Sequence, residues 1–283
     1  MKKLLLLFIS LYAFASSYNQ DMLKNINLAN DHQKHFSFAV MGDNRDGDYI
    51  LKKIIRNINK DKDIKFAINN GDLVPDGYKK EFRSYLSIIN TSNKPVLSII
   101  GNHEISWYEG ETNYEKTFGK TYFSFDYKNS YFIILDSSSK KGIFNRQYKW
   151  LKKELKKSQR YQNRFVFMHV PLYDPRKGKY QKGHSLKKIK NADKLNKLFD
   201  KYKVTMLFCS HIHLYLRGKW NKTPYIITGG AGAPLKKNGF YHYIKVIVNS
   251  DYIQYKVIKI DATPLSLTGE MMQSIKDIFN LER

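Results

Sequence analysis

Cysteine is almost absent from this sequence of 283 residues, in which Cys209 is the only one. A chain with one cysteine cannot form an intramolecular disulfide. We therefore expect its stability to come from a buried core or from bound metal. Cys209 lies within the apolar run at residues 204–210, where we expect it to be an inert core residue.

Long hydrophobic segments are missing as well. The chain begins with Lys2 and Lys3, continues with an apolar stretch from Leu4, and reaches the small-x-small sequence Ala13-Phe14-Ala15. This order is typical of a secretory signal, and the apolar stretch is shorter than the about 20 residues of a membrane anchor. We expect residues 1–15 to be cleaved and the protein to be exported, to the periplasm or secreted by a bacterium, without a transmembrane segment. A lipoprotein is excluded because no cysteine follows the cleavage site.

The sequence also lacks a Pro/Gly/Ser-rich linker, a low-complexity tract and an internal repeat, features that mark boundaries between folding units. We therefore expect a flexible N-terminal segment over residues 16–34 and one domain over residues 35–283, most simply a monomer. The domain should end in an amphipathic helix. The apolar positions of that helix are Met271, Ile275, Ile278 and Phe279.

Acidic residues are scarce: 25 Asp and Glu stand against 49 Lys and Arg, so the formal net charge is +24. Such a field attracts anions of any kind, including phosphorylated small molecules, nucleic acid and lipid head groups. The charge alone does not choose among them. Much of it lies in helix-like stretches such as residues 150–160, for which a solvated helix face is the simpler interpretation.

Short apolar runs rich in β-branched and aromatic residues alternate with lysine-rich segments of helical periodicity, a pattern typical of layered α/β proteins. The predicted strands are residues 36–41, 65–69, 95–100, 131–136, 164–169, 204–210 and 225–228. The predicted helices between the first three strands are residues 49–61 and 79–92. Two hairpins, turning at residues 128–129 and 249–251, add antiparallel pairs, so we expect mixed sheets.

Polar side chains that can bind metal follow several of these strands. They are Asp43, Asp72, Asn102 with His103, His169, and His211 with His213. Ligands in open α/β sheets gather outside the carboxyl ends of the strands. Glycine precedes Asp43, Asp72 and Asn102, where it lets the backbone bend sharply. A shared metal site explains these strand ends better than separate turns, in which Asp, Asn and Gly are also common.

The ligand types in this set limit the metal. Carboxylates, an amide oxygen and imidazoles suit Mn, Fe or Zn better than Ca or a thiolate site. Two aspartates, one asparagine and three histidines are too many ligands for one tetrahedral ion. We therefore expect two divalent or trivalent ions that share a bridging carboxylate. Such a pair can hold a hydroxide and stabilise the in-line displacement of a phosphoryl group.

The order of these motifs resembles the calcineurin-like metallophosphoesterase family, including its purple acid phosphatase-like members. The motifs are Gly42-Asp43, Gly71-Asp72-Leu73-Val74, Gly101-Asn102-His103-Glu104, His169, Ser210-His211-Ile212-His213 and the glycine-rich residues 229–232. Each motif alone is weak, but their order along the chain is specific. The resemblance implies an α/β fold, the four-layer α/β/β/α sandwich with two mixed β-sheets.

The resemblance also implies a role for each residue. Asp43 and His213 would bind one metal, Asp72 would bridge, and the other metal would be bound by Asn102, His169 and His211. His103 would face the phosphate, where it protonates the leaving oxygen or stabilises the charge that develops there. We expect the catalytic residues to be His103, Asn102 and Arg45.

The first motif departs from the family, whose usual Asp-x-His is here Asp43-Asn44-Arg45. Arginine stays protonated and cannot bind a metal, and the tyrosine of the purple acid phosphatases is replaced by Pro75. Water, Tyr49 or Asp46 are the alternatives for the missing ligand. Arg45 either binds a phosphate oxygen or pairs with a nearby carboxylate at the rim.

Other histidines and aromatic residues are assigned more simply. We expect His184 and His242 to be core or rim residues. The aromatic residues that follow the motifs could line the pocket; they are Trp107, Tyr108, Tyr173 and Tyr215.

Two functional hypotheses follow. The first is an exported phosphoesterase with two metals, a phosphatase or phosphodiesterase in which a metal-bridging hydroxide attacks the phosphorus of a phosphorylated small molecule or, with help from the basic surface, of nucleic acid. The alternative is a non-catalytic basic envelope protein that binds an anionic polymer or lipid and has a structural metal site.

Overall fold

The computed structural model describes residues 16–28, 35–178 and 181–262 of the chain. Its strands are β1 (Phe36–Met41), β2 (Ile64–Asn69), β3 (Val96–Ser98), β4 (Phe123–Tyr127), β5 (Ser130–Leu135), β6 (Asn163–Met168), β7 (Met206–Cys209), β8 (Tyr215–Trp220), β9 (Thr223–Thr228), β10 (His242–Val248) and β11 (Ile253–Lys259). Its helices are α1 (Tyr18–Leu28), α2 (Asp48–Lys60), α3 (Lys79–Ile89), α4 (Gly110–Phe118), α5 (Asn145–Lys157) and α6 (Ile189–Lys201), with a short 3₁₀-helix η1 (Ser158–Arg160).

These strands form two mixed sheets. One sheet has five strands in the order β11-β10-β1-β2-β3, and the other has six in the order β4-β5-β6-β7-β9-β8. The central strands of each sheet are parallel, whereas β10, β11, β4 and β8 join in antiparallel pairs. Both predicted hairpins are therefore confirmed, as β4–β5 and β10–β11.

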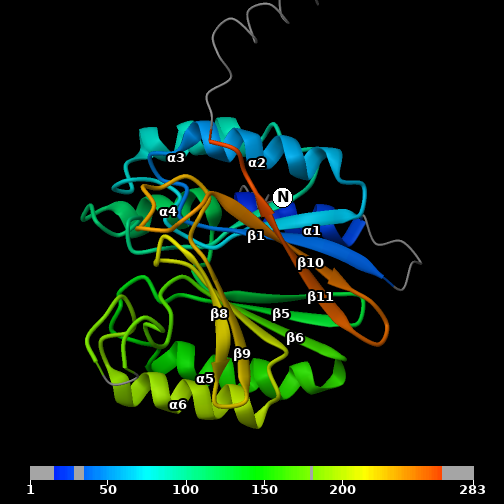
Figure 1. Ribbon diagram of the computed structural model, residues 1–283, viewed down its shortest axis with the longest axis vertical. Coiled ribbons are helices and arrows are strands. Elements are labelled where there is room, and N and C mark those ends of the chain that lie inside the picture. The colour runs from blue at the N-terminus through cyan, green and yellow to red at the C-terminus, as the bar shows by residue number, and fades with distance from the viewer. Residues whose placement is uncertain (1–15, 29–34, 179–180, 263–283) are drawn as a thin grey trace, which may run out of the picture.

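The two sheets pack face to face, and helices cover their outer faces (Figure 1). In β1, Phe36, Phe38 and Val40 point into the core between the sheets, while Ala39 and Met41 point to the helices on the other side. Alternation in a strand sends successive side chains to opposite faces, and here both faces are buried. This burial explains why the strands read as continuous apolar runs. The expected four-layer α/β/β/α sandwich is confirmed.

The layer between the sheets is rich in phenylalanine. The Phe38 ring stacks on Phe66 at 5.5 Å and meets Phe132 and Phe165 edge-on at 5.4 and 5.1 Å. Offset and edge-on contacts of this kind add to the free energy gained from burial. The rings bring strands from both sheets together, and so hold the strand ends of one sheet against those of the other.

The expectation of a flexible segment over residues 16–34 is wrong for Tyr18–Leu28, which form α1. The Asn19 side chain is buried and makes two hydrogen bonds with the backbone of Ser98: its amide donates to the carbonyl at 2.8 Å, and its oxygen accepts from the N–H at 3.0 Å. Asn19 thus pairs with the edge strand β3 as a further strand would. Propensity did not reveal this helix because tertiary contacts hold it.

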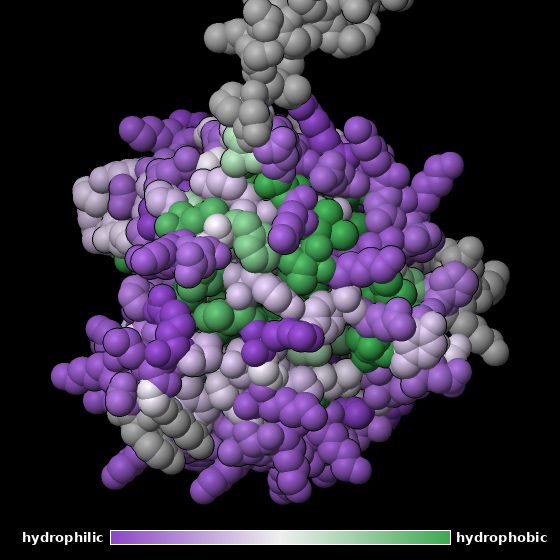
Figure 2. All heavy atoms as spheres, in the orientation of Figure 1, coloured by the Kyte–Doolittle hydropathy of each residue, from purple (hydrophilic) through white to green (hydrophobic). Residues whose placement is uncertain are grey.

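Each predicted strand and helix within the described residues is confirmed within a few residues. Sequence reasoning did not identify β8, α4 or α6. The predicted signal at 1–15 and the predicted C-terminal helix lie outside the described residues. Among the helices of the described ranges, none combines the length and apolar character needed to cross a bilayer. Hydrophilic side chains cover the upper and lower helical layers, and hydrophobic ones gather between them (Figure 2).

Replacing Phe38 by alanine tests the core between the sheets. Because this ring is 0% exposed and its loss leaves a cavity, Phe38→Ala should lower the free energy of unfolding by about 3–5 kcal/mol, measured by urea denaturation. Tyr252→Ala is the control, since Tyr252 is 54% exposed and should change the value by about 0.5 kcal/mol at most. Equal effects of the two changes would contradict this account.

Candidate metal centre

The polar residues after the strands stand at sharp backbone turns. Asp43, Asp72 and His211 have φ angles of 58°, 53° and 68°, in the left-handed region that residues other than glycine seldom adopt. Strain of this kind is kept where the surrounding structure requires it, often at functional sites. Here the turn directs each side chain into the space between the two sheets at the carboxyl ends of their strands.

Glycines let the motif loops approach one another. A Cβ on Gly71 would lie 2.7 Å from His169 Nδ1, and one on Gly101 would lie 2.3 Å from the backbone nitrogen of Asp72. Neither contact can be accommodated, so a side chain at either position would push the loops apart. The glycines therefore serve close packing, and the sharp bend at the first motif falls on Asp43, the residue after Gly42, rather than on the glycine.

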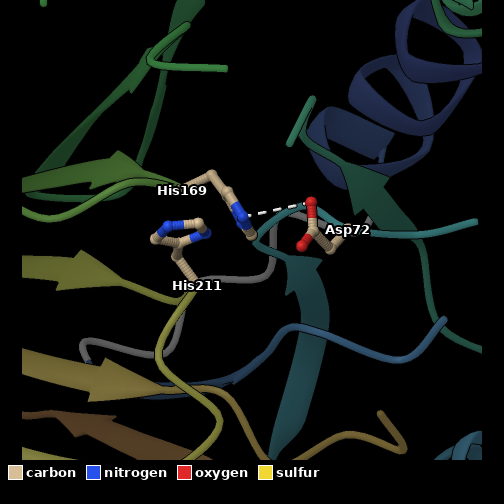
Figure 3. Close-up of side chains that lie close together, drawn as sticks. All are labelled: Asp72, His169 and His211. Carbon is tan, nitrogen blue, oxygen red and sulfur yellow. Dashed lines mark ion pairs between the residues drawn. The ribbon is translucent and has the colours of Figure 1, made fainter. Parts of the chain in front are cut away.

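The structure brings the predicted ligands together in two groups that share one carboxylate. Asp72, His169 and His211 form one group, Asp43, Asp72 and His213 the other, and the ligand atoms within each group lie within 4.8 Å of one another. Figure 3 shows the first group, in which His169 Nε2 lies 3.1 Å from Asp72 Oδ1. In the second group, His213 Nε2 lies 3.6 Å from Asp43 Oδ1. Asp72 thus lies where a bridging carboxylate is needed.

Backbone carbonyls orient three of the imidazole rings. The Nδ1 atom of His169 lies 2.9 Å from the oxygen of Asn70, that of His213 lies 2.6 Å from the oxygen of Pro234, and that of His103 lies 2.6 Å from the oxygen of Pro75. A carbonyl oxygen only accepts, so Nδ1 is the nitrogen that carries the proton. This leaves Nε2 facing the centre, as in histidines that bind metal.

Three polar atoms at the centre are buried without a hydrogen-bond partner in the described part of the chain. They are Asp43 Oδ1, Asn102 Oδ1 and His169 Nε2. Burying such atoms unpaired is costly, and a cation among them would satisfy all three. The residues present therefore fit a metal site. Asn102, which the sequence placed among the ligands, thus has an unpaired side-chain oxygen of the kind that binds metal.

The pKa values of the cluster show how strongly its members depend on one another. Burial is the largest influence on the pKa of His169 and lowers it, but the attraction and hydrogen bond of Asp72, together with the attraction of Asp43 and the carbonyl of Asn70, outweigh burial and raise it to about 9. Burial raises the pKa of Asp43 well above its usual range. Burial, together with repulsion from His169, lowers the pKa of His211 to about 2. Each buried group is thus charged only where an opposite charge inside the cluster supports it.

Glu104 holds the bridging carboxylate in place, a role that the sequence analysis did not assign. Its side chain is 0% exposed and accepts four backbone N–H bonds: from Asp72 and Gly101 at one oxygen, and from Leu73 and Val74 at the other. Burial raises the pKa of Glu104 to about 8, whereas the N–H donors act to lower it. The signal for this role in the sequence is the position of Glu104, a carboxylate that directly follows the apolar run and the Asn102-His103 pair.

Asn70 is a second residue that sequence reasoning missed. Its backbone oxygen orients His169, and its side-chain amide donates to the carbonyl of Met168 and to Ser210 Oγ, at 3.2 and 3.3 Å. Asn70 directly follows β2 of one sheet, whereas Met168 ends β6 and Ser210 directly follows β7 of the other. It therefore links the two sheets beside the metal centre.

The unusual first motif has a specific arrangement. Arg45 Nη1 lies 2.7 Å from Asp46 Oδ2, so the rim pairing considered for this arginine is the one observed. Its charge also acts on His213, whose pKa is lowered first by burial and further by Arg45. Asp46 is thereby engaged by Arg45, and Tyr49 lines a separate cavity of about 460 Å³ that also includes Pro75. The structure thus brings neither alternative ligand into the two groups.

The remaining candidates divide between core and rim. His242 is buried, and Tyr173 is buried with its hydroxyl donating to Asp193. His184 is exposed, with its ring 5.7 Å from the His211 ring, which makes it a rim residue.

Among the aromatic residues that follow the motifs, Trp107 packs between the rings of Tyr78 and Tyr108. Tyr215 packs on His242, so Tyr173 and Tyr215 belong to the body of the fold.

Comparison with known proteins finds three informative similarities. The family described as calcineurin-like phosphoesterase matches residues 36–215. Fe(3+)-Zn(2+) purple acid phosphatase 12 of Arabidopsis thaliana is 28% identical over 54% of this chain and 36% of its own length. Purple acid phosphatase 21 of the same plant is 28% identical over 69% of this chain and 49% of its own length. The chain thus spans less than half of either relative.

Among solved structures, purple acid phosphatase PPD1 from yellow lupin (Lupinus luteus) has the same fold. It superposes with a TM-score of 0.63 at 19% identity, over 80% of this chain and 52% of that structure.

Changing Glu104 to glutamine tests its role at the centre. Because the amide nitrogen would face N–H donors, Glu104→Gln should lower the free energy of unfolding by on the order of 3 kcal/mol and weaken the binding of divalent ions, measured by urea denaturation and calorimetry. Glu109→Gln, at an exposed glutamate, is the matched control. Unchanged stability and unchanged ion binding in Glu104→Gln would show that the four bonds are not needed.

Proposed function

This chain belongs to the calcineurin-like phosphoesterase family, and on that premise we propose that it hydrolyses phosphate esters with two metal ions. The observation that carries the proposal is the pair of ligand groups that share Asp72. Asp43 and His213 would hold one ion, and Asn102, His169 and His211 the other. Mn, Fe and Zn suit this set of oxygen and nitrogen ligands.

The chemistry needs groups that no side chain supplies. When bound, two such ions provide Lewis acidity toward phosphoryl oxygens and lower the pKa of an attacking water. The buried Asp72 lies between the two groups, and the backbone N–H of His103 donates to its Oδ1 at 3.0 Å. The protein thus holds its ligands in place before a substrate arrives, which lowers the cost of organising the site during the reaction.

His103 is suited to give a proton to the leaving oxygen. Its Nδ1–H is occupied by the carbonyl of Pro75, so Nε2 is the nitrogen left to carry a proton that is transferred in the reaction. That nitrogen lies 3.9 Å from Asp72 Oδ2, and the side chain is 28% exposed. The exposure gives a substrate access to this nitrogen. This is the arrangement that general acid catalysis requires.

Metal removal and replacement test the proposed hydrolysis. Protein treated with a chelator should lose activity toward p-nitrophenyl phosphate or bis-p-nitrophenyl phosphate and regain it with Mn, Fe or Zn ions. Asp72→Asn should lower kcat/KM by on the order of 100-fold or more, because the charge stabilisation of several kcal/mol that the ions provide depends on this carboxylate. Asp251→Asn, in the exposed turn after β10, is the control.

The same experiment distinguishes the two functional hypotheses. Full activity of Asp72→Asn would contradict the proposed site. Absence of turnover at every metal loading, with salt-sensitive binding of anionic polymer or lipid, would favour the non-catalytic alternative.

We also propose that the protein is exported, on the basis of residues 1–15 alone. Expression of the full chain in a bacterium should give a mature protein that begins at Ser16, identified by N-terminal sequencing of the periplasmic and culture fractions. Replacing apolar residues of the stretch that starts at Leu4 by charged ones should leave the uncleaved chain inside the cell. Cleavage that persists in that variant would argue against a signal peptide.

A further inference from the structure

Three loops from different parts of the chain carry basic residues to the rim of the metal centre. Lys140 lies in the loop between β5 and α5, His184 in the loop between β6 and α6, and Lys236 in the loop between β9 and β10. None of the three is a predicted metal ligand.

Lys140 is held in one position by its backbone. It has a φ angle of 60°, its N–H donates to the carbonyl of Ser137 at 3.0 Å, and its own carbonyl accepts the N–H of Lys187 at 2.7 Å. The side chain is half-buried. Burial lowers the pKa of Lys140, and the charge of Asp72 acts to raise it. The bond to Lys187 attaches Lys140 to the loop of His184, whose ring lies 5.7 Å from the His211 ring.

Lys236 approaches from the opposite half of the centre. Its backbone N–H donates to the carbonyl of His213 at 3.2 Å, so it is attached to the motif that carries two of the predicted ligands. Its charge acts on two imidazoles: after burial, it helps to lower the pKa of both His213 and His184. Lys236 itself is exposed and free to reach a bound molecule.

The backbone of His184 is fixed by a buried carboxylate. Its backbone N–H donates to Asp174 Oδ2 at 2.9 Å. The same carboxylate accepts two bonds from the Arg176 guanidinium, at 2.9 and 2.7 Å. Asp174 is thus fully engaged and does not neutralise the lysines. Burial and the charges of Arg176, Lys236 and Lys140 all lower the pKa of His184.

The ammonium groups of Lys140 and Lys236 have no carboxylate partner among the described residues. Neither lysine forms an ion pair with any residue of the described ranges. Among the described groups, Asp72 is the one carboxylate whose charge acts on Lys140, and a bound metal would take up that charge. Cations gathered beside a metal centre repel one another, so an anion placed between them is favoured.

We propose that Lys140, Lys236 and His184 form an anion subsite beside the metal centre that binds a second negatively charged group of the substrate. This inference rests on the proposed hydrolysis and specifies its substrate class: phosphate esters that carry a further phosphate or carboxylate. The scissile phosphate would lie on the metal side, and the second anion under the two lysines. Charge-assisted hydrogen bonds from the ammonium groups would hold it.

Matched aryl phosphates test the subsite. Metal-loaded protein should hydrolyse 3-carboxyphenyl phosphate and 1,3-phenylene bisphosphate with a kcat/KM about tenfold above that for phenyl phosphate, mainly through a lower KM. The two charged substrates distinguish a carboxylate from a phosphate as the second group. In Lys140→Gln and in Lys236→Gln this preference should fall several-fold, and in the double variant it should disappear.

Adjacent lysines provide the controls. Lys141→Gln and Lys237→Gln remove the same charge from exposed positions next in the chain, and should leave the preference unchanged. Thermal denaturation of every variant verifies that the fold is retained. Loss of the preference in the control variants as well would show that the overall positive field, rather than the subsite, selects these substrates.

Two outcomes separate this inference from the function on which it rests. Hydrolysis of all three substrates with equal kcat/KM in the unmodified protein would overturn the subsite and leave the phosphoesterase function standing. Hydrolysis of none of them at any metal loading would contradict the function itself, and the subsite with it.

Discussion

The carboxylate of Glu104 is the interaction on which the arrangement of the centre depends. It accepts four backbone N–H groups from the loops that follow β2 and β3, and so it fixes these loops against each other. Asp72, which belongs to both ligand groups, lies in one of them. A single buried acid thus determines where the shared ligand stands. Each of these bonds also satisfies a backbone N–H group that would otherwise lack a partner close to the buried centre.

The two sheets make different contributions to the centre. Asp43, Asp72 and Asn102 follow strands β1, β2 and β3 of one sheet, whereas His169, His211 and His213 follow β6 and β7 of the other. Oxygen ligands therefore come from one sheet and nitrogen ligands from the other. The distance between them is set by the phenylalanine layer between the sheets and by Asn70, which bonds across them. The packing of the core therefore also determines the spacing of the metal ligands.

Negative and positive side chains occupy different parts of the loops around the centre. Carboxylates are buried at its floor, where backbone N–H groups and imidazoles hold them. Lysines occupy its rim, and Asp174 and Asp46 at that rim are paired with Arg176 and Arg45. The buried carboxylates are thus available to metal ions, and the lysines of the rim are available to the proposed anionic substrate. The large net charge of +24 would assist the approach of such a substrate over longer distances.

The sequence by itself determined the strands, the mixed sheets and the identity of the clustered residues. Apolar runs buried on both faces have a strong pattern, and polar residues such as Asp72 and His169 directly after them can only lie at the strand ends. Only the tertiary structure decided the rest. The roles of Glu104 and Asn70 and the ordering of α1 by Asn19 depend on contacts between residues distant in the chain. Such contacts leave no periodicity in the sequence, because they arise from how the sheets and loops pack rather than from local conformation.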